Sequence, residues 1–229
     1  MSIAIFDLDN TLLAGDSDAL WGEFISEQGI VDAEFYAQEN QRFYEEYKAG
    51  ELDIYEFLNF SLKPLSEHSL ETLGQLHQQF MTQKIEPIML PAAHRLLEEH
   101  RAQGHLLMII TATNSFVTGP IAKSLGVEVL IATDPEMDQG AYTGKVAGTP
   151  CFQEGKVVRL QQWLQEHQRE LGESWFYSDS RNDLPLLEMV DHPVAVDPDD
   201  ALMQHAEMRG WPVVTLRQGE QRQPLSTSR

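Results

Sequence analysis

The N-terminal stretch, residues 2–13, constrains the fold more than any other part of the chain. Residues 3–6 form a β-branched and aromatic run that ends at acidic and turn residues, which predicts a buried strand. Asp7 and Asp9 follow it, and side chains two residues apart point to the same side of a strand. Two carboxylates about 5 Å apart repel by roughly 3 kcal/mol at an effective dielectric near 20. An oxygen-bound divalent cation such as Mg²⁺ would offset this repulsion, although Asp-Asn-Thr is also good turn chemistry.

Composition narrows the class of partner. The 229 residues can bury a real core, and the formal net charge of -20 disfavours binding to nucleic acid or to an anionic membrane surface. Cys151 is the only cysteine, so no intrachain disulfide can form, and a reducing compartment is expected. The longest apolar run, residues 106–110, is too short to cross a bilayer, and we expect no signal peptide, since the chain enters a predicted strand within three residues. We expect a cytoplasmic protein, either a monomer or a homodimer.

Residues 15–86 contain no segment that favours a strand. Their apolar residues recur at helical spacing, as at Trp21, Phe24 and Ile25, and glycines and a proline interrupt the pattern. This predicts about four helices that form an inserted helical cap domain. The remaining segments, 1–14 and 87–229, would form one discontinuous core domain, and we expect hinges near residues 14–15 and 87.

From residue 91 onward, predicted helices and strands alternate, which is typical of a parallel sheet covered on both faces. The predicted fold class is α/β, with a doubly wound, Rossmann-like core. The polar tail from residue 217 is expected to be loose. Predicted strands span residues 106–110, 127–131, 142–146, 175–177 and 194–196, and predicted helices span residues 94–101, 115–125, 155–170, 183–189 and 199–208.

Polar residues gather where the predicted strands end. Ligands of open α/β sheets bind at the carboxyl ends of the strands, so these positions are the candidate site. Each residue alone also suits an ordinary strand-end hydroxyl, a solvated lysine or a helix cap, whereas their joint occurrence favours a site. Besides the first aspartate pair, they are Thr111, Lys156, Asp179, Asn182 and Asp183.

These motifs, in this order, resemble the haloacid dehalogenase superfamily. The resemblance rests on D-x-D-x-T at residues 7–11, Thr111, Lys156 and the sequence Ser-Asp-Ser-Arg-Asn-Asp at residues 178–183, and it covers nearly the whole chain. The helical insert is similar to the cap of phosphoserine-phosphatase-like members. The resemblance implies a phosphomonoester hydrolase that acts on a small phosphorylated metabolite, requires Mg²⁺ and forms an aspartyl phosphate.

The resemblance also implies catalytic roles. Asp7 matches the nucleophile that attacks phosphorus, and Asp9 matches the acid that protonates the leaving oxygen and later activates water. Lys156 matches the cation that offsets the charge of nucleophile and phosphate. These residue types suit the reaction, because a transferring phosphoryl group is loose and negatively charged, so catalysis depends on positioning and electrostatic stabilisation.

The implied binding roles fall on the same motifs. Thr111 and Asn182, together with Lys156, would contact the phosphoryl oxygens. Asp7, the backbone carbonyl of Asp9 and Asp179 would hold Mg²⁺. The metal site would be supported by Asp183.

The cap residues bear on the substrate. Asp16 matches the acid that binds the substrate's amino group in phosphoserine phosphatases, and it equally suits a helix N-cap. The matching arginine is absent, because residues 55–64 contain only Lys63, and Arg42 lies one helix earlier. A substrate carboxylate would normally meet a bidentate guanidinium. The sequence therefore favours a phosphorylated amino alcohol, with L-histidinol phosphate, an intermediate of amino-acid biosynthesis, as the first choice.

We expect Asp16 and one of the eight cap aromatics between residues 35 and 60 to bind this substrate. Phosphoserine is an alternative substrate, and a phosphotransferase or mutase is an alternative activity. A non-catalytic phospho-accepting module is the least favoured, because a stable phospho-aspartate does not need an adjacent acid such as Asp9.

Overall fold

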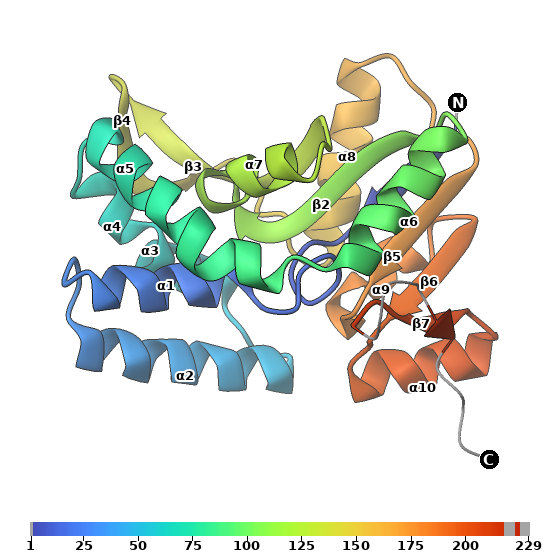
Figure 1. The fold of residues 1–229 in the computed structure, drawn as a ribbon, viewed down its shortest axis with the longest axis horizontal. Helices are drawn as coiled ribbons and strands as arrows, with labels where there is room; N and C mark the ends of the chain where they lie inside the picture. The colour runs from blue at the N-terminus through green and yellow to red at the C-terminus, as the bar shows by residue number, and fades with distance from the viewer. Residues whose placement is uncertain (1, 218–222, 225–229) are drawn as a thin grey trace.

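A single sheet organises the part of the chain that the structure, a computed structural model, describes, namely residues 2–217 and 223–224. Within those residues it has eight strands in the order β4-β3-β2-β1-β5-β6-β7-β8 (Figure 1). The central strand β1 (Ile3–Phe6) pairs in parallel with β2 (Leu106–Asn114) and β5 (Ser174–Ser178). The parallel part continues through β3 (Val129–Asp138), β6 (His192–Val196) and β7 (Val213–Thr215), and the antiparallel edges are β4 (Ala141–Ala147) and β8 (Gln223–Pro224).

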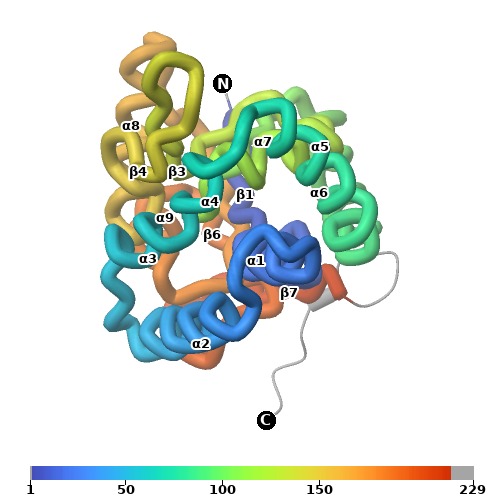
Figure 2. The backbone as a smooth tube through the Cα atoms, turned by 90° about the vertical axis from the view of Figure 1, so that its left-hand side faces the viewer, coloured from blue at the N-terminus to red at the C-terminus, as the bar shows by residue number. Residues whose placement is uncertain are grey.

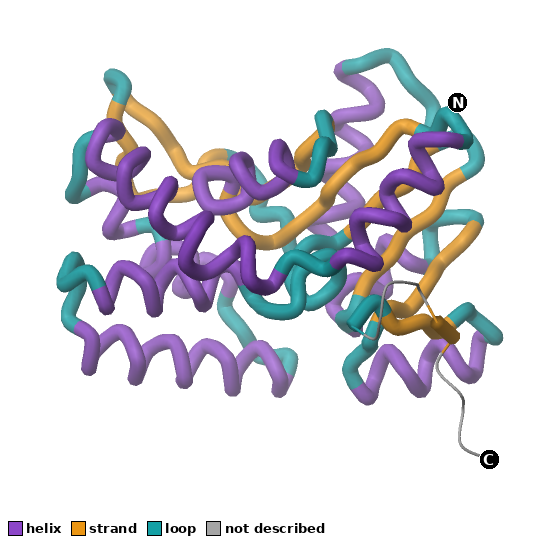
Figure 3. The backbone as a smooth tube through the Cα atoms, in the orientation of Figure 1, coloured by secondary structure: helices purple, strands orange, loops and turns teal. Residues whose placement is uncertain are grey.

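Both faces of the sheet are covered by helices (Figure 3). Side chains alternate along β1, so Ala4 and Phe6 belong to one hydrophobic cluster, whereas Ile3 and Ile5 belong to the other. The first face packs against α6 (Pro91–Ala102) and α7 (Ser115–Ser124), and the second packs against α8 (Glu154–Glu166), α9 (Leu184–Leu187) and α10 (Asp200–Arg209). This arrangement confirms the predicted doubly wound α/β fold.

Residues 15–86, which we call the cap segment, are helical between their connecting turns. Figure 2 views the molecule from the side of this segment, with α1 and α2 in blue. Capping side chains start the longer helices, for example Asp16 at α1 and Ser69 at α5. The cap segment contains α1 (Ser17–Glu27), α2 (Ala33–Ala49), α3 (Ile54–Ser61), α4 (Lys63–Ser66) and α5 (Leu70–Phe80), followed by a π-helix (Met81–Ile85) and a 3₁₀-helix (Glu86–Ile88). Its status as a separate domain stays a prediction.

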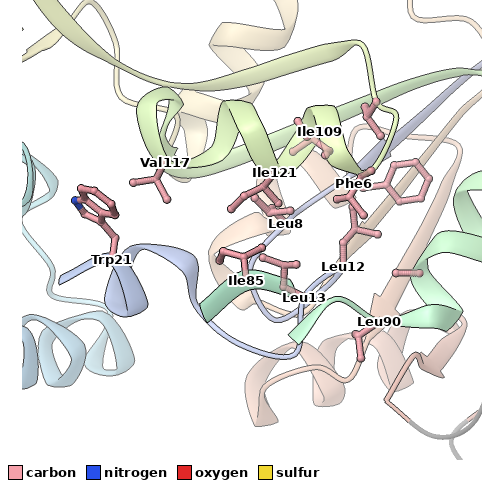
Figure 4. Close-up of a cluster of buried hydrophobic side chains, with 14 of the residues drawn as sticks. Phe6, Leu8, Leu12, Leu13, Trp21, Ile85, Leu90, Ile109, Val117 and Ile121 are labelled. Carbon is pink, nitrogen blue, oxygen red and sulfur yellow. The ribbon is translucent and has the colours of Figure 1, made fainter. Parts of the chain in front are cut away.

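The cap segment leaves and rejoins the rest of the chain at adjacent points. Leu13 and Met89 form an antiparallel bridge, and the backbone N–H of Ala14 donates to the carbonyl of Ile88 at 2.8 Å. One continuous hydrophobic cluster spans this junction, and Figure 4 shows side chains from β1 and α7 beside others from the cap segment. The cap segment is therefore packed on α7 as well as tethered at its two ends.

The observed elements depart from the predicted ones in several places. Strand β2 continues to Asn114, past the predicted end at residue 110, and β3 continues to Asp138. The polar residues at the end of β2 are buried because they have partners, such as the Thr113 hydroxyl, which donates to Asp9 at 2.7 Å. The three-residue strand β7 was not predicted, since so short a run carries no periodicity. Most of the expected loose tail, residues 218–222 and 225–229, lies outside the described residues, but residues 223–224 pair with β7 as β8, so the prediction of a loose tail is wrong for them.

No helix in the described part of the chain is both long enough and apolar enough to cross a bilayer.

Candidate active site

The nucleophile predicted from the sequence, Asp7, lies at the carboxyl end of β1 and is only 7% exposed. Its backbone N–H donates to the Tyr177 carbonyl of β5 at 2.9 Å, which fixes its position in the sheet. Lys156 Nζ donates to Asp7 Oδ1 at 2.7 Å and to Asp183 Oδ2 at 2.8 Å. The structure thus brings these three predicted residues into one buried ion cluster.

Lys156 reaches this cluster from the first turn of α8. A Cβ at the preceding Gly155 would overlap the Pro150 carbonyl oxygen, so only glycine permits this approach of the helix to the loop before it. Burial disfavours the lysine charge, but the carboxylates of Asp183 and Asp7 outweigh that effect and raise the pKa of Lys156 above its ordinary value. The amine therefore stays protonated at neutral pH.

Asp179 follows β5 and faces Asp7 across a shared hydroxyl. Thr11 Oγ1 lies 3.5 Å from Asp7 Oδ2 and 3.2 Å from Asp179 Oδ1. Burial, followed by repulsion from Asp7 and Asp183, raises the pKa of Asp179 well above its ordinary value. Burial also raises the pKa of Asp7 to about 7, against the opposing effect of Lys156. The carboxylates of Asp7, Asp179 and Asp183 thus lie around a single lysine, which is paired with two of them. The cluster therefore has more acidic groups than cations.

This excess charge suits a cation bound by oxygen atoms. The predicted Mg²⁺ set has two carboxylates, Asp7 and Asp179, and one backbone carbonyl, that of Asp9. Mg²⁺ often binds proteins through one or two carboxylates and retains several waters. Among the described residues, no three His, Cys, Asp or Glu side chains are grouped as metal ligands, and the predicted set does not require such a group. The residues present therefore fit Mg²⁺.

Asp9 is held at both carboxylate oxygens. Oδ1 accepts the backbone N–H of Ser17 at 2.6 Å, at the N-terminus of α1, and Oδ2 accepts the Thr113 hydroxyl at 2.7 Å. Burial, followed by repulsion from Asp16, raises the pKa of Asp9 to about 6, while these hydrogen bonds from Ser17 and Thr113 lower it. A carboxyl group that titrates near neutral pH is suited to acid–base catalysis.

The other two predicted phosphate-binding residues, besides Lys156, lie beside this cluster and are buried. Thr111 is 1% exposed, and its hydroxyl oxygen accepts the Thr113 N–H at 3.2 Å, which leaves its own proton for another acceptor. Asn182 is 8% exposed, and its Oδ1 accepts from Gln153 Nε2 at 3.0 Å. Gln153 precedes α8 with a φ of 50°, a region sparsely populated by residues other than glycine.

The cap residues named from the sequence have different surroundings. Asp16 is exposed and caps α1, because its Oδ1 accepts the backbone N–H groups of Asp18 and Ala19 at 2.9 and 3.0 Å. Lys63 has 71% of its side chain exposed. Arg42 is committed to the cap segment itself, where it forms 2.8 Å ion pairs with Glu39, Glu46 and Glu56.

Sequence reasoning missed several residues of the site. Thr113 could have been found, because it lies two residues after Thr111 and therefore on the same side of β2. Ser17 contributes only its backbone, and Gln153 acts through a contact that no local pattern predicts. Tyr47 of α2 was one of eight cap aromatics, yet its hydroxyl lies 2.8 Å from Ser180 Oγ in the loop after β5.

Comparison with known families agrees with this geometry. The sequence pattern of the family described as haloacid dehalogenase-like hydrolase matches residues 4–188, which is most of the chain. The chain belongs to this family. The prediction that it is an enzyme of the haloacid dehalogenase superfamily is therefore confirmed.

Individual relatives are similar over nearly their whole length. A histidinol-phosphatase of Neisseria meningitidis serogroup C (strain 8013) is 43% identical over 220 residues, which cover 94% of this chain and 99% of that protein. A crystal structure of a protein with unknown function from Bordetella pertussis Tohama I has a TM-score of 0.88 at 45% identity and covers 93% of this chain and 97% of its own. A substrate-bound phosphoserine phosphatase has a TM-score of 0.66 at 16% identity and covers 89% of each chain, which shows a shared fold.

Proposed function

We propose that this hydrolase is a Mg²⁺-dependent phosphomonoesterase that forms an aspartyl phosphate and acts on L-histidinol phosphate. One observation carries the proposed chemistry. Asp7 is a buried carboxylate with one oxygen on Lys156 and the other facing Asp179 across the Thr11 hydroxyl. A carboxylate in such surroundings is oriented for attack, with its charge offset by Lys156 on one side and, on the side of Asp179, by the Mg²⁺ that the two carboxylates would bind.

In the first step, a carboxylate oxygen of Asp7 attacks phosphorus. The bond between phosphorus and the substrate's alcohol oxygen breaks, and Asp9 donates its proton to that leaving oxygen. Lys156 holds the attacking carboxylate, while Thr111 and Asn182 donate hydrogen bonds to the phosphoryl oxygens. Their positions are set before the substrate binds, which is how an active site stabilises charge without reorganisation.

In the second step, Asp9 is ionised and takes a proton from a water molecule. That water attacks the phosphorus of the aspartyl phosphate, inorganic phosphate leaves, and the Asp7 carboxylate is restored. Mg²⁺ bound by Asp7, Asp179 and the Asp9 carbonyl would supply the positive charge that lets an anionic nucleophile approach an anionic phosphate. A pKa of Asp9 near 6 suits both roles, as donor and as acceptor.

Two observations favour histidinol phosphate over phosphoserine. The relative with 43% identity over 94% of this chain is named a histidinol-phosphatase. In addition, Arg42 is tied to three glutamates, so the cap segment offers no free guanidinium there for a substrate carboxylate. The Asp16 carboxylate, exposed at the start of α1, is available for the substrate's ammonium group. We place the enzyme in the cytoplasm, in histidine biosynthesis.

The test is phosphate release from L-histidinol phosphate and L-phosphoserine in parallel, with Mg²⁺ and with EDTA. We expect a strong preference for histidinol phosphate, loss of activity in EDTA, and at least a roughly 10³-fold loss in Asp7→Asn. A preference for phosphoserine would contradict the substrate assignment. Activity retained by Asp7→Asn would contradict the aspartyl-phosphate mechanism, and formation of a transferred product with an added alcohol acceptor would indicate a phosphotransferase.

A further inference from the structure

Tyr47 is an aromatic residue of the cap segment whose hydroxyl contacts the loop after β5, residues 179–183. Tyr44 lies three residues earlier on the same helix, is 53% exposed and contacts Lys48. Tyr47 is half-buried, and its hydroxyl oxygen lies 2.8 Å from Ser180 Oγ. Most of the other cap aromatics pack against one another, in the cluster formed by Phe35, Tyr36, Phe43, Phe57 and Phe60.

The direction of the Tyr47–Ser180 hydrogen bond follows from counting protons. Ser180 Oγ accepts the backbone N–H of Asn182 at 3.2 Å and Asn182 Nδ2 at 3.3 Å. Those two contacts occupy both lone pairs of the serine hydroxyl. Its single proton is therefore directed to the Tyr47 oxygen, which also contacts the Asn182 side chain, and the phenol proton of Tyr47 is left for a bound ligand.

A second contact places the end of α2 against the same loop. Gly50 ends α2 with a φ of 78°, and a Cβ there would overlap the Arg181 guanidinium. A cation at a helix C-terminus also interacts favourably with the helix dipole. Tyr47 and Gly50 therefore meet the consecutive residues Ser180 and Arg181, which fixes the position of the phenol relative to Asn182.

We propose that Tyr47 is a further substrate-binding residue, whose phenol proton is donated to an oxygen at the phosphoryl end of the bound substrate. This inference rests on the proposed function, because it takes Asn182 to lie beside the phosphoryl group. Ser180 acts as the positioning residue: it binds Asn182 through its oxygen and orients Tyr47 through its proton. The cap segment thus contributes one of the donors that recognise phosphate.

The test is calorimetric binding of inorganic phosphate in the presence of Mg²⁺, which needs no turnover. Because Tyr47 would donate a hydrogen bond to a charged phosphate oxygen, we expect Tyr47→Phe to weaken phosphate binding by about 10- to 100-fold. Tyr44→Phe is the matched control, since it removes a hydroxyl from the same helix at an exposed position, and it should bind phosphate like the wild type. Melting temperatures of both variants show whether the fold is retained.

Ser180→Ala provides an independent variant, because it keeps the phenol and removes the group that orients it. We expect a three- to tenfold loss of phosphate affinity from Ser180→Ala, and little further loss when it is combined with Tyr47→Phe. Phosphate affinity within twofold of wild type in Tyr47→Phe would overturn the inference, as would fully additive effects of the two substitutions. Absence of hydrolysis by a wild-type protein that binds phosphate would contradict the proposed function and leave this inference standing.

Discussion

The strand-end edge of the sheet and the cap segment hold their charged residues in different ways. At the edge, Asp7, Lys156 and Asp183 are at most 7% exposed, and Lys156 binds both carboxylates directly. In the cap segment, Arg42 has 36% of its side chain exposed and Asp16 is exposed. Buried pairs are costly to break, whereas exposed pairs contribute little. The edge therefore suits a reaction whose groups must stay in place, whereas exposed residues of the cap segment can be substituted at little cost in stability.

The largest expected effect is at the edge, from Lys156→Met. The substitution leaves Asp7 and Asp183 buried without their cation, and breaking such a pair costs about 3–5 kcal/mol. We expect a melting temperature lower by about 6 °C or more, and a fall in kcat of about 10²- to 10³-fold. Calorimetry and steady-state kinetics measure the two effects. The matched control is Lys123→Met, a lysine in the last turn of α7, which should leave kcat unchanged.

A smaller effect is expected in the cap segment from Asp16→Asn. Asparagine caps a helix as well as aspartate does, so the substitution removes the charge and keeps the cap of α1. We expect KM for L-histidinol phosphate to rise about 10- to 100-fold with little change in melting temperature. Asp32→Asn makes the same exchange at the cap of α2 and should leave KM unchanged. An unaltered KM in Asp16→Asn would exclude Asp16 from substrate binding.

Asp18 of α1 accepts a hydrogen bond from Asn114 of β2 and so lies between the two regions. Its raised pKa leads us to expect that the stability of the fold depends on pH. Burial, followed by repulsion from Asp16 and Asp9, raises its pKa to about 8, against a hydrogen bond from Asn114. A carboxyl whose pKa is raised on folding stabilises the fold fully below its unfolded pKa, and this contribution is lost as pH rises through about 8. Asp18→Asn removes the ionisable group. We expect its melting temperature to exceed that of the wild type by about 3–6 °C at pH 8.5.

This difference should shrink toward zero near pH 4.5, where Asp18 is protonated in the folded protein. Thermal unfolding of both proteins across this pH range tests the expectation. A difference that is independent of pH would show that the substitution acts through packing.

The smallest effect is expected from Arg42→Gln. Its three ion pairs are partly exposed and stay within the cap segment, so solvent screens them and their net contribution to stability is small. We expect kcat/KM for both candidate substrates to stay within about twofold of wild type. A selective loss of phosphoserine hydrolysis would show that Arg42 binds the substrate's carboxylate after all.

The sequence allowed the catalytic edge to be anticipated because strand ends of one parallel sheet must meet. Asp7 and Asp179 could be assigned to the same edge because both follow predicted strands, and the place of Lys156 beside Asp7 was expected from the family resemblance, whereas its contact with Asp183 was not predicted. The apolar run at residues 3–6 likewise predicted a buried strand. These inferences depend on periodicity and topology, which a sequence carries locally.

Contacts between the cap segment and the loop after β5 could not be predicted in this way. Helical spacing assigns Tyr47 to the interior of the cap segment, and nothing in its neighbourhood indicates Ser180, which lies 133 residues away. The hydrogen bond from Ser17 to Asp9 is donated by a backbone N–H, which every residue except proline possesses. Such contacts arise from the three-dimensional packing of separate elements.

The paired backbone at Ala14 and Ile88 has a consequence for how this chain can be altered. Since the cap segment begins and ends at hydrogen-bonded neighbours, its removal would leave a gap that a two- or three-residue turn can close. A helical segment of another length could be spliced in at the same junction without moving β1 or α6. The core would in this respect accept other helical segments, so the cap segment, to which we assign the choice of substrate, would be exchangeable.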